Sequence, residues 1–355
     1  MTLPPGATIG ILGAGQLGRM LAGAAIRLGF RVHILAPEDA APARATCHAY
    51  TRADYGDAGA LSAFAAACDV VTVEFENVPV AAVEAIAAAG VPVRPNGRAL
   101  AVAQDRAEEK RFLEAAGLVC APWRPVDSLA DLEAAAAAIG PKAILKTRRQ
   151  GYDGKGQRRL DAGSDLAGAW QGLSGAPAIL EAHVAFEMEI SVLIARDGEG
   201  ARITDTPPQT HHAMGILRRS RVPAPLPGAV VEEAKALAGQ LADQLDYIGV
   251  LALEFFVVSG RRLIANEFAP RVHNSGHWSV EACETCQFEN HIRAVAGWPL
   301  GDPALRFPAE MENLIGEDAE APVADLLSRG RLTLYGKQAA RPGRKMGHLV
   351  RRLAP

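Results

Sequence analysis

The chain has 355 residues, of which 49% are hydrophobic and 22% charged, and its formal net charge is −3. This length exceeds what one hydrophobic core usually organises, so we expect two or three domains. The balanced charge lacks the basic surplus that nucleic-acid binding requires. No run approaches the roughly 18 unbroken apolar residues of a membrane span. We therefore expect neither a nucleic acid nor a membrane as partner.

The five cysteines are odd in number and scattered, which predicts reduced thiols in a cytoplasmic protein. Cys283 and Cys286 form a lone CxxC pair, and a helix through them would place both sulfurs on one packed face. Packing explains this pair better than zinc or redox chemistry does.

The first hundred residues alternate strand and helix, which predicts a parallel sheet with helices on both faces. Strands are expected at residues 8–12, 31–35, 70–75 and 91–94, and helices at 16–28, 58–67 and 80–89. Pro95-Asn96-Gly97 breaks this rhythm and marks the first boundary. Beyond it we expect helices at 98–116, 130–138, 229–245 and 279–296, and strands at 143–147, 178–181, 187–195, 203–205, 250–258 and 261–268. Residues 299–308 resemble a linker to a small C-terminal piece.

The segment GAGQLG, residues 13–18, follows a strand and opens a helix, as the Rossmann pyrophosphate loop does. NAD binding would also require an acidic residue at the end of the second strand. Here Glu38 and Asp39 are displaced into a loop flanked by proline. A phosphate of another ligand, or a purely structural turn, fits as well.

Two further segments combine charge with turn-forming residues. Glu74, Glu76 and Asn77 lie at the C-terminal end of a parallel strand, where α/β sheets bind ligands, although Asn77 could simply cap the next helix. Residues 148–157 form a basic, glycine-rich loop after Lys146, which lies on an apolar strand. Such a loop can wrap a triphosphate, with Lys146 and Lys155 neutralising its charge, or it can be a turn in solvent. Lys146 favours the first interpretation, because a lysine on an apolar strand needs an anion.

Glu254 and Glu267 lie on two strands that we expect to form a hairpin turning at Ser259-Gly260. Glu254 then faces Glu267 directly, or faces Ala265 with Glu267 diagonal to it. Facing carboxylates destabilise a sheet unless a cation lies between them, and oxygen ligands suit Mg²⁺. A glutamate that meets solvent or an arginine is the alternative.

Weaker patterns complete the set. The polar end of strand 178–181 could hold an adenine edge, and Glu189 could bind sugar hydroxyls. The pair His211-His212 is more typical of a surface loop than of a metal site. Residues 341–348 are a basic turn that could clamp a substrate phosphate or remain a solvated tail.

In this order the motifs resemble the ATP-grasp superfamily, and most closely its family of N5-carboxyaminoimidazole ribonucleotide synthetases. The resemblance is carried by GAGQLGRM (13–20), EFENVP (74–79), GYDGKGQ (151–157), NEFAPRVHNSGHW (266–278) and RPGRKMGH (341–348). It implies a mixed α/β and α+β fold with a Rossmann-like pre-ATP-grasp domain at 1–97 and an ATP-grasp domain at 98–300, with a lid lobe at about 120–184. A small β-rich subdomain would follow at 301–355, and the chain would form a homodimer.

The resemblance also implies a reaction and a site. Bicarbonate and ATP would carboxylate 5-aminoimidazole ribonucleotide through carboxyphosphate, in purine biosynthesis. ATP would contact Arg106, Lys146, Gly151, Tyr152, Asp153, Gly154, Lys155, Gly156, Gln157, Glu181, Ala182, His183, Val184, Glu189, His212, Asn266 and Glu267. Mg²⁺ would bind Glu254 and Glu267. The ribonucleotide would meet Gly15, Gln16, Leu17, Glu76, Asn274, Ser275, Arg344 and Lys345, and catalysis would involve Asp153, Lys155, Arg271 and His273. Another ATP-grasp ligase, such as a formate-dependent glycinamide ribonucleotide transformylase, is the alternative, and an NAD-dependent oxidoreductase is a more distant one.

Overall fold

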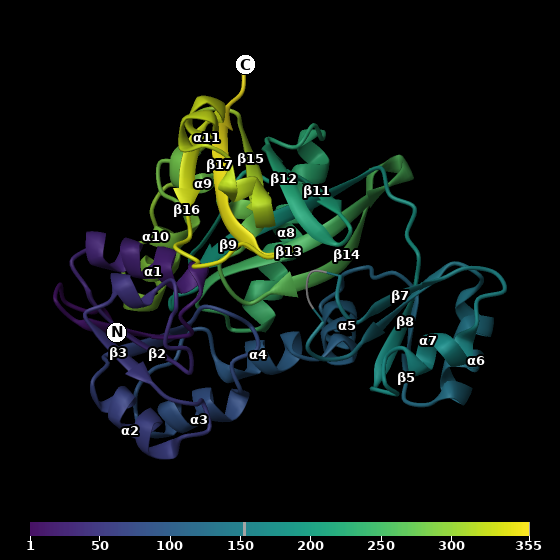
Figure 1. The fold of residues 1–355 in the computed structure, drawn as a ribbon, viewed down its shortest axis with the longest axis horizontal. Helices are drawn as coiled ribbons and strands as arrows, with labels where there is room; N and C mark the ends of the chain where they lie inside the picture. Colours follow the sequence, from purple (N-terminus) through teal and green to yellow (C-terminus); the bar gives the residue numbers. More distant parts are fainter. Residues whose placement is uncertain (152–153, 355) are drawn as a thin grey trace.

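Three sheets organise the computed structural model, which describes residues 1–151 and 154–354 (Figure 1). The first domain and the lid lobe lie at opposite ends below the largest sheet, and helices α4 (Gly97–Ala103) and α5 (Arg106–Ala115) run between them. The expected mixed fold class is confirmed. None of the helices in the described part of the chain is both long and apolar enough to cross a membrane.

The first sheet is parallel and has the order β3-β2-β1-β4. Its strands are β1 (Thr8–Leu12), β2 (Arg31–Ala36), β3 (Ala49–Arg52) and β4 (Val70–Val73), and its helices are α1 (Gln16–Arg27), α2 (Ala58–Ala66) and α3 (Val80–Ala88). Helix α1 covers one face through Leu17 and Leu21, while α2 and α3 cover the other. The strand expected at 91–94 is reduced to a single bridge between Val71 and Val93.

The lid lobe contains an antiparallel sheet of order β5-β8-β6-β7. Its elements are β5 (Trp123–Val126), α6 (Leu129–Ile139), β6 (Ala143–Thr147), β7 (Gln157–Leu160), α7 (Leu166–Gln171) and β8 (Ala178–Ala182). Leu132 and Ala135 of α6 pack on Leu145 and Leu180 of the sheet, which gives the lobe its own core.

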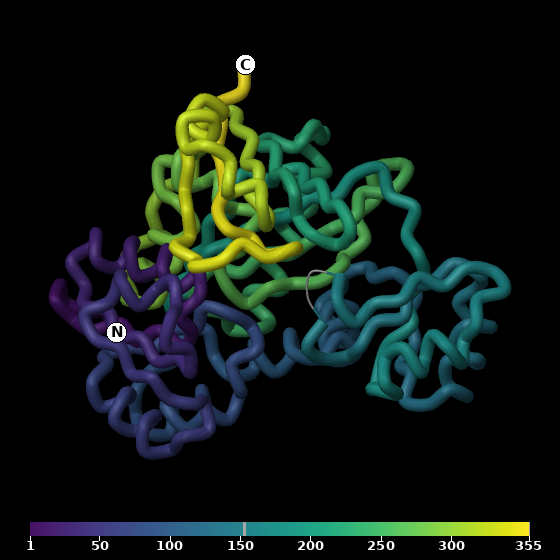
Figure 2. The backbone as a smooth tube through the Cα atoms, in the orientation of Figure 1, coloured from purple at the N-terminus to yellow at the C-terminus, as the bar shows by residue number. Residues whose placement is uncertain are grey.

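The largest sheet is antiparallel, with the order β14-β13-β9-β11-β12-β15-β17-β16 and with β10 beside β9. Its strands are β9 (Met188–Arg196), β10 (Arg202–Thr204), β11 (Gln209–Ala213), β12 (Ile216–Val222), β13 (Gly249–Val258), β14 (Arg262–Ala269), β15 (Ala309–Ile315), β16 (Arg331–Leu334) and β17 (Lys345–Arg352). The C-terminal strands thus extend the central sheet, because β15 pairs with β12. Figure 2 shows the last part of the chain passing beside the first domain.

Helices cover both faces of this sheet. Helix α8 (Gly228–Gln244) packs on one face, against Leu251 and Leu253. Helix α10 (Gln287–Ala296) packs on the other face and also touches α1 of the first domain. The remaining helices are α9 (Ser279–Ala282), α11 (Val323–Arg329) and the short 3-10 helices η1 (Arg44–Thr46), η2 (Ser259–Arg261), η3 (Asn274–Gly276) and η4 (Gly316–Glu320).

Two of the expected helices are each broken in two. The helix expected at 98–116 divides at Asp105, whose side chain caps α5 by accepting from the Ala107 N–H. The helix expected at 279–296 ends at Ala282 and restarts at Gln287, with Cys283 and Cys286 extended. The two cysteines therefore do not share one helix face, and both are free and buried.

Candidate active site

Glu254 and Glu267 face each other directly across strands β13 and β14. The pairing that starts at the turn sets Phe255 opposite Ala265, and a β-bulge then shifts the register by one residue. Without that bulge, Asn266 would lie opposite Glu254, and Glu267 would point to the other face of the sheet. Of the two arrangements left open by the sequence, the structure adopts direct opposition.

The two carboxylates have strongly different environments. Burial would raise the pKa of Glu267, but Arg106 at 2.7 Å outweighs burial and lowers this pKa to about 2. Burial, with the negative charge of Glu267 second, raises the pKa of Glu254 to about 7. Glu267 is therefore ionised, whereas Glu254 gains most from an added positive charge.

These residues fit a magnesium ion that is also held by phosphate. Among the described residues, no group of three or more His, Cys, Asp or Glu side chains could hold a metal ion. Two carboxylates alone match the usual Mg²⁺ site in nucleotide enzymes, where substrate phosphates and water complete the shell. Burial and the charge of Glu267 raise the pKa of Glu254, so an added positive charge would favour its ionised form.

Lys146 forms an ion pair with a buried partner on the neighbouring strand. Its Nζ lies 2.5 Å from Glu181, and Nζ of Lys110 lies 2.5 Å from the other oxygen of the same carboxylate. Burial opposes ionisation of Glu181, yet the two lysines lower its pKa to about 2. The anionic partner that we predicted for Lys146 from its apolar strand is therefore the carboxylate of Glu181 in this structure.

The glycine-rich loop is anchored to α5 at its base. The Arg148 guanidinium donates two hydrogen bonds to Asp105, at 3.0 and 2.9 Å, and Arg106 donates to the Gly151 carbonyl at 3.3 Å. Gly156 has φ +69°, and a Cβ there would lie 2.5 Å from Thr147 Oγ1. Gly154 lies against the Met214 carbonyl of the β11–β12 turn, so the loop reaches from the lid lobe to the large sheet. Lys155 is exposed and Gln157 begins β7, while Tyr152 and Asp153 lie outside the described residues.

The end of β8 at Ala182 and the segment that follows it connect the lid lobe to the large sheet. Ala182, His183 and Val184 are half-buried. Beyond it, Glu189 and His212 lie 3.0 Å apart on β9 and β11. Burial would lower the pKa of His212, but the hydrogen bond that Glu189 accepts from its ring raises it. His212 is therefore the histidine on the same side of the sheet as Glu189, whereas His211 is exposed.

Arg271 and His273 follow β14 and lie beside Glu254. Arg271 binds Glu76 of the first domain through two nitrogens, one of them 3.1 Å from its oxygen, and this ion pair lowers the pKa of Glu76 to about 2 against the effect of burial. His273 Nε2 lies 3.3 Å from Glu254. Burial, with Arg271 second, lowers the pKa of His273 to about 3, so its ring is neutral.

Asn274 and Ser275 are fixed by the sheet beneath them. Asn274 and Asn313 exchange two hydrogen bonds, of 3.0 and 2.7 Å. The hydroxyl of Ser275 donates to Ser191 Oγ at 2.8 Å and is buried. The Ser275 hydroxyl also lies 2.8 Å from Nδ1 of His273, and the Ser275 backbone N–H lies 3.4 Å from the same nitrogen. These contacts hold the 271–275 segment against β9 and β15.

The GAGQLG loop is occupied by a carboxylate of the protein itself. Glu74 accepts hydrogen bonds from the backbone N–H groups of Gly15 and Gly18, at 2.6 and 2.7 Å. A Cβ at Gly13 would lie 2.3 Å from Glu74, so this glycine is needed for the close approach. In this structure the Gly15 N–H donates to Glu74, and the contact of Gly15 with the ribonucleotide stays a prediction. Gln16 and Leu17 begin α1 beside it.

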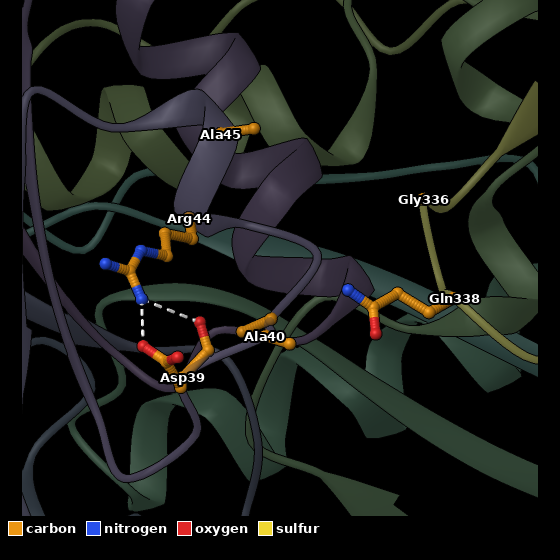
Figure 3. A pocket seen from close by; sticks show the side chains of 7 residues that line it. Asp39, Ala40, Arg44, Ala45, Gly336 and Gln338 are labelled. Atoms are coloured by element: carbon orange, nitrogen blue, oxygen red, sulfur yellow. Dashed lines mark hydrogen bonds and ion pairs between the residues drawn. The ribbon is translucent and has the colours of Figure 1, made fainter.

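Asp39, one of the two acidic residues displaced into the loop after the second strand, also has a partner. Asp39 is bound by Arg44, which donates to its carboxylate and, at 2.9 Å, to its carbonyl. Both line a pocket with Gly336 and Gln338 of the C-terminal segment, and Figure 3 shows the ion pair on one wall. Near this segment, Arg344 donates to the Ala339 carbonyl and Lys337 to the Lys345 carbonyl.

Comparison with known proteins covers the whole chain. The ATP-grasp domain matches residues 111–288, the ribonucleotide synthetase preATP-grasp domain matches 6–104, and the phosphoribosylaminoimidazole carboxylase C-terminal domain matches 309–351. A protein of Brucella melitensis named N5-carboxyaminoimidazole ribonucleotide synthase is 50% identical over 353 residues, which are 99% of this chain and 97% of the relative. The chain belongs to the N5-carboxyaminoimidazole ribonucleotide synthase family.

Solved structures of this synthase family agree along the chain. The synthetase from Thermus thermophilus is 45% identical with a TM-score of 0.91, and the match covers 97% of this chain and 93% of that one. The synthase from Aspergillus clavatus, in complex with ADP and 5-aminoimidazole ribonucleotide, is 28% identical with a TM-score of 0.89, covering 98% and 94%. The predicted superfamily and family are therefore confirmed.

Several residues of this synthase family site escaped sequence reasoning. Lys110 and Glu109 lie in a charged helix that is typical of a solvent face, yet both are 2% exposed. Burial, with Glu267 second, raises the pKa of Glu109 to about 8. Sequence reasoning also missed Asn313, which bonds Asn274, and Gln287, whose side chain bonds the backbone of His273. The partners of both residues lie in distant segments. The periodicity of apolar residues, which predicts helices and strands, would not have identified any of these polar residues.

Proposed function

We propose that this chain is an ATP-dependent ligase that carboxylates 5-aminoimidazole ribonucleotide with bicarbonate. The products are N5-carboxyaminoimidazole ribonucleotide, ADP and phosphate, in purine biosynthesis. One observation carries this proposal beyond the family name. Glu254 belongs to the carboxylate pair suited to a metal-bound triphosphate, and it lies 3.3 Å from His273, next to the Arg271–Glu76 ion pair of the first domain. The nucleotide side and the acceptor side of the reaction thus meet at adjacent residues.

ATP would lie between the lid lobe and the large sheet. Arg106, Lys146 and the glycine-rich loop would neutralise and wrap its phosphates, while residues 181–184 would meet the base and Glu189 the ribose. Glu254 and Glu267 would hold Mg²⁺, with Asn266 beside them at the bulge. When bound, this ion would supply charge neutralisation at the phosphates.

The ribonucleotide would lie against the first domain. Its ring would meet Glu76 and Arg271, and its phosphate would meet the start of α1 at Gln16 and Leu17, with Arg344 and Lys345 from the C-terminal segment. Asn274 and Ser275 support this surface through their contacts to the sheet. Because Glu74 already fills the loop at Gly15, the phosphate has to approach the helix start beside it.

The chemistry requires positioning and charge more than covalent help. A bicarbonate oxygen attacks the γ-phosphorus while the bond to the β-phosphate oxygen breaks, which gives carboxyphosphate and ADP. Phosphate then leaves as the ribonucleotide amine bonds to the carboxyl carbon and loses a proton. Lys155, Arg271 and His273 would line this centre with Asp153. Carboxyphosphate hydrolyses readily, so the loop that reaches Met214 would exclude water.

The oligomeric state and location follow the same proposal. We expect a homodimer, as the family resemblance implies, and a cytoplasmic location, since the cysteines are free. Sedimentation of the purified chain tests the first expectation.

The deciding experiment is ADP release by the purified chain with and without 5-aminoimidazole ribonucleotide and bicarbonate. Full turnover should require ATP, bicarbonate and 5-aminoimidazole ribonucleotide. The carboxylated ribonucleotide should appear in step with ADP. ADP release indifferent to the ribonucleotide would contradict the specific assignment. Stimulation by glycinamide ribonucleotide and formate would instead favour the transformylase alternative.

A further inference from the structure

The alternation of residues along strand β14 shifts by one position at Asn266, relative to its partner β13. This shift places Glu267 opposite Glu254. Ala265 donates its N–H outward, to the Val119 carbonyl at 2.8 Å. Backbone groups of a regular strand alternate between its two edges, so the N–H of Phe268, three residues on, should point inward to β13. It points outward instead and donates to Glu109 Oε1 at 2.7 Å.

Helix α5 provides the partners for the groups that the shift turns outward. The Asn266 carbonyl accepts from Lys110 Nζ at 2.6 Å, and the Phe268 N–H is taken by Glu109. Glu109 and Lys110 are consecutive and 2% exposed, so water does not replace these contacts. Strand β14 is the outermost strand of its sheet, and its outward groups would otherwise lack ladder partners.

Local sequence does not require the bulge at this point. The segment 265–268 contains neither glycine nor proline, the residues that most often mark such irregularities. The contacts from α5 are therefore the features that distinguish the shifted register from the regular one. In the regular register, Glu267 would turn away from Glu254 and the pair would not form.

We propose that Glu109 and Lys110 are positioning residues that hold β14 in its bulged register and so keep the two carboxylates together. This inference rests on the proposed function, because it assigns these residues a role in binding the metal–nucleotide complex. Glu109 acts through an oxygen acceptor at the right reach, and not through its charge. That distinction separates it from a residue that merely tunes the electrostatics of the site.

Two substitutions of Glu109 test this role with opposite expectations. Glu109→Gln removes the charge but keeps an acceptor oxygen at the same reach, whereas Glu109→Asp keeps the charge and draws the oxygen back by one methylene. Binding of ADP should be measured by calorimetry with Mg²⁺, without the ribonucleotide or bicarbonate. We expect the Asp variant to bind at least about tenfold more weakly, as typical for outer-shell partners of a metal site, and the Gln variant to stay within about threefold of the parent.

The matched control is Glu108→Asp, the same change on the neighbouring, exposed residue of α5, which should leave binding unchanged. The dissociation constant for the ribonucleotide should be unchanged in all variants, which a general loss of structure would not allow. Weak binding by the Gln variant with normal binding by the Asp variant would overturn the inference, and so would equal effects of both. A parent chain that fails to bind ADP with Mg²⁺ would instead overturn the proposed function, and the inference with it.

Discussion

Arg271 and Glu76 form a two-point ion pair that joins the segment after β14 to the first domain. The arginine side chain is 15% exposed and the glutamate 26% exposed, so the pair is partly shielded from solvent. The two residues are far apart in the sequence and belong to different domains. Their contact ties the segment that carries His273, the neighbour of Glu254, to the first domain.

Glu76→Gln should weaken this link and the binding of the ribonucleotide. We expect the KM for 5-aminoimidazole ribonucleotide to rise at least about tenfold, while the KM for ATP changes little. The free energy of unfolding should fall by about 2 kcal/mol, because Arg271 loses a charged partner in a partly buried site. Steady-state kinetics and urea unfolding measure both quantities, with exposed Glu84→Gln as control. A rise in the KM for ATP alone would contradict the placement.

Glu267→Gln should abolish turnover and leave the fold intact. The substitution removes the negative charge that Arg106 faces and that Mg²⁺ would need, a loss of several kcal/mol at the transition state. We expect kcat/KM for ATP to fall by about a hundredfold or more, measured with saturating Mg²⁺. Glu312→Gln on β15, away from the site, is the control. Circular dichroism should match the parent, and retained activity would refute the metal role.

The Glu181 ion pairs should make stability sensitive to acid. The pKa of Glu181 is about 2 in the folded chain, below its ordinary value of 4.5. Its contribution is therefore fully present above pH 4.5 and is lost as the pH falls toward 2. Glu181→Gln leaves Lys110 and Lys146 without this buried partner, so unfolding at pH 7 should cost about 3 kcal/mol less. Urea unfolding of parent and variant should converge as the pH falls below 4, and a constant difference down to pH 3 would disprove this account.

Gly156→Ala should impair ATP use more than an equivalent change elsewhere in the lid lobe. Gly156 has a positive φ, and the added Cβ would meet Thr147 Oγ1 at 2.5 Å. Gly163 also has a positive φ, but nothing lies within 4 Å of its Cβ, so Gly163→Ala pays only the backbone cost of about 1 kcal/mol. We expect a higher KM for ATP in the Gly156 variant only. Equal kinetics of the two variants would show that the Thr147 contact is unimportant.

The order of the motifs and most of the secondary structure can be predicted from the amino-acid sequence alone. Strands such as β1 and β6 and the β13–β14 hairpin follow from apolar runs and turn residues, which act over a few positions. Lys146 on its apolar strand predicted an anionic partner, which in this structure is Glu181, while its contact with a triphosphate stays a prediction. The motif order sufficed to identify the family.

The contacts between distant segments are visible only in the folded chain. The bulge at Asn266 sets the faces of Glu254 and Glu267, and it depends on Glu109 and Lys110, residues more than 150 positions away. The same holds for Glu74, which follows β4 and accepts from the Gly15 and Gly18 N–H groups in the glycine loop and the start of α1. Such contacts depend on burial and charge pairing between distant segments, and local periodicity carries no information about them.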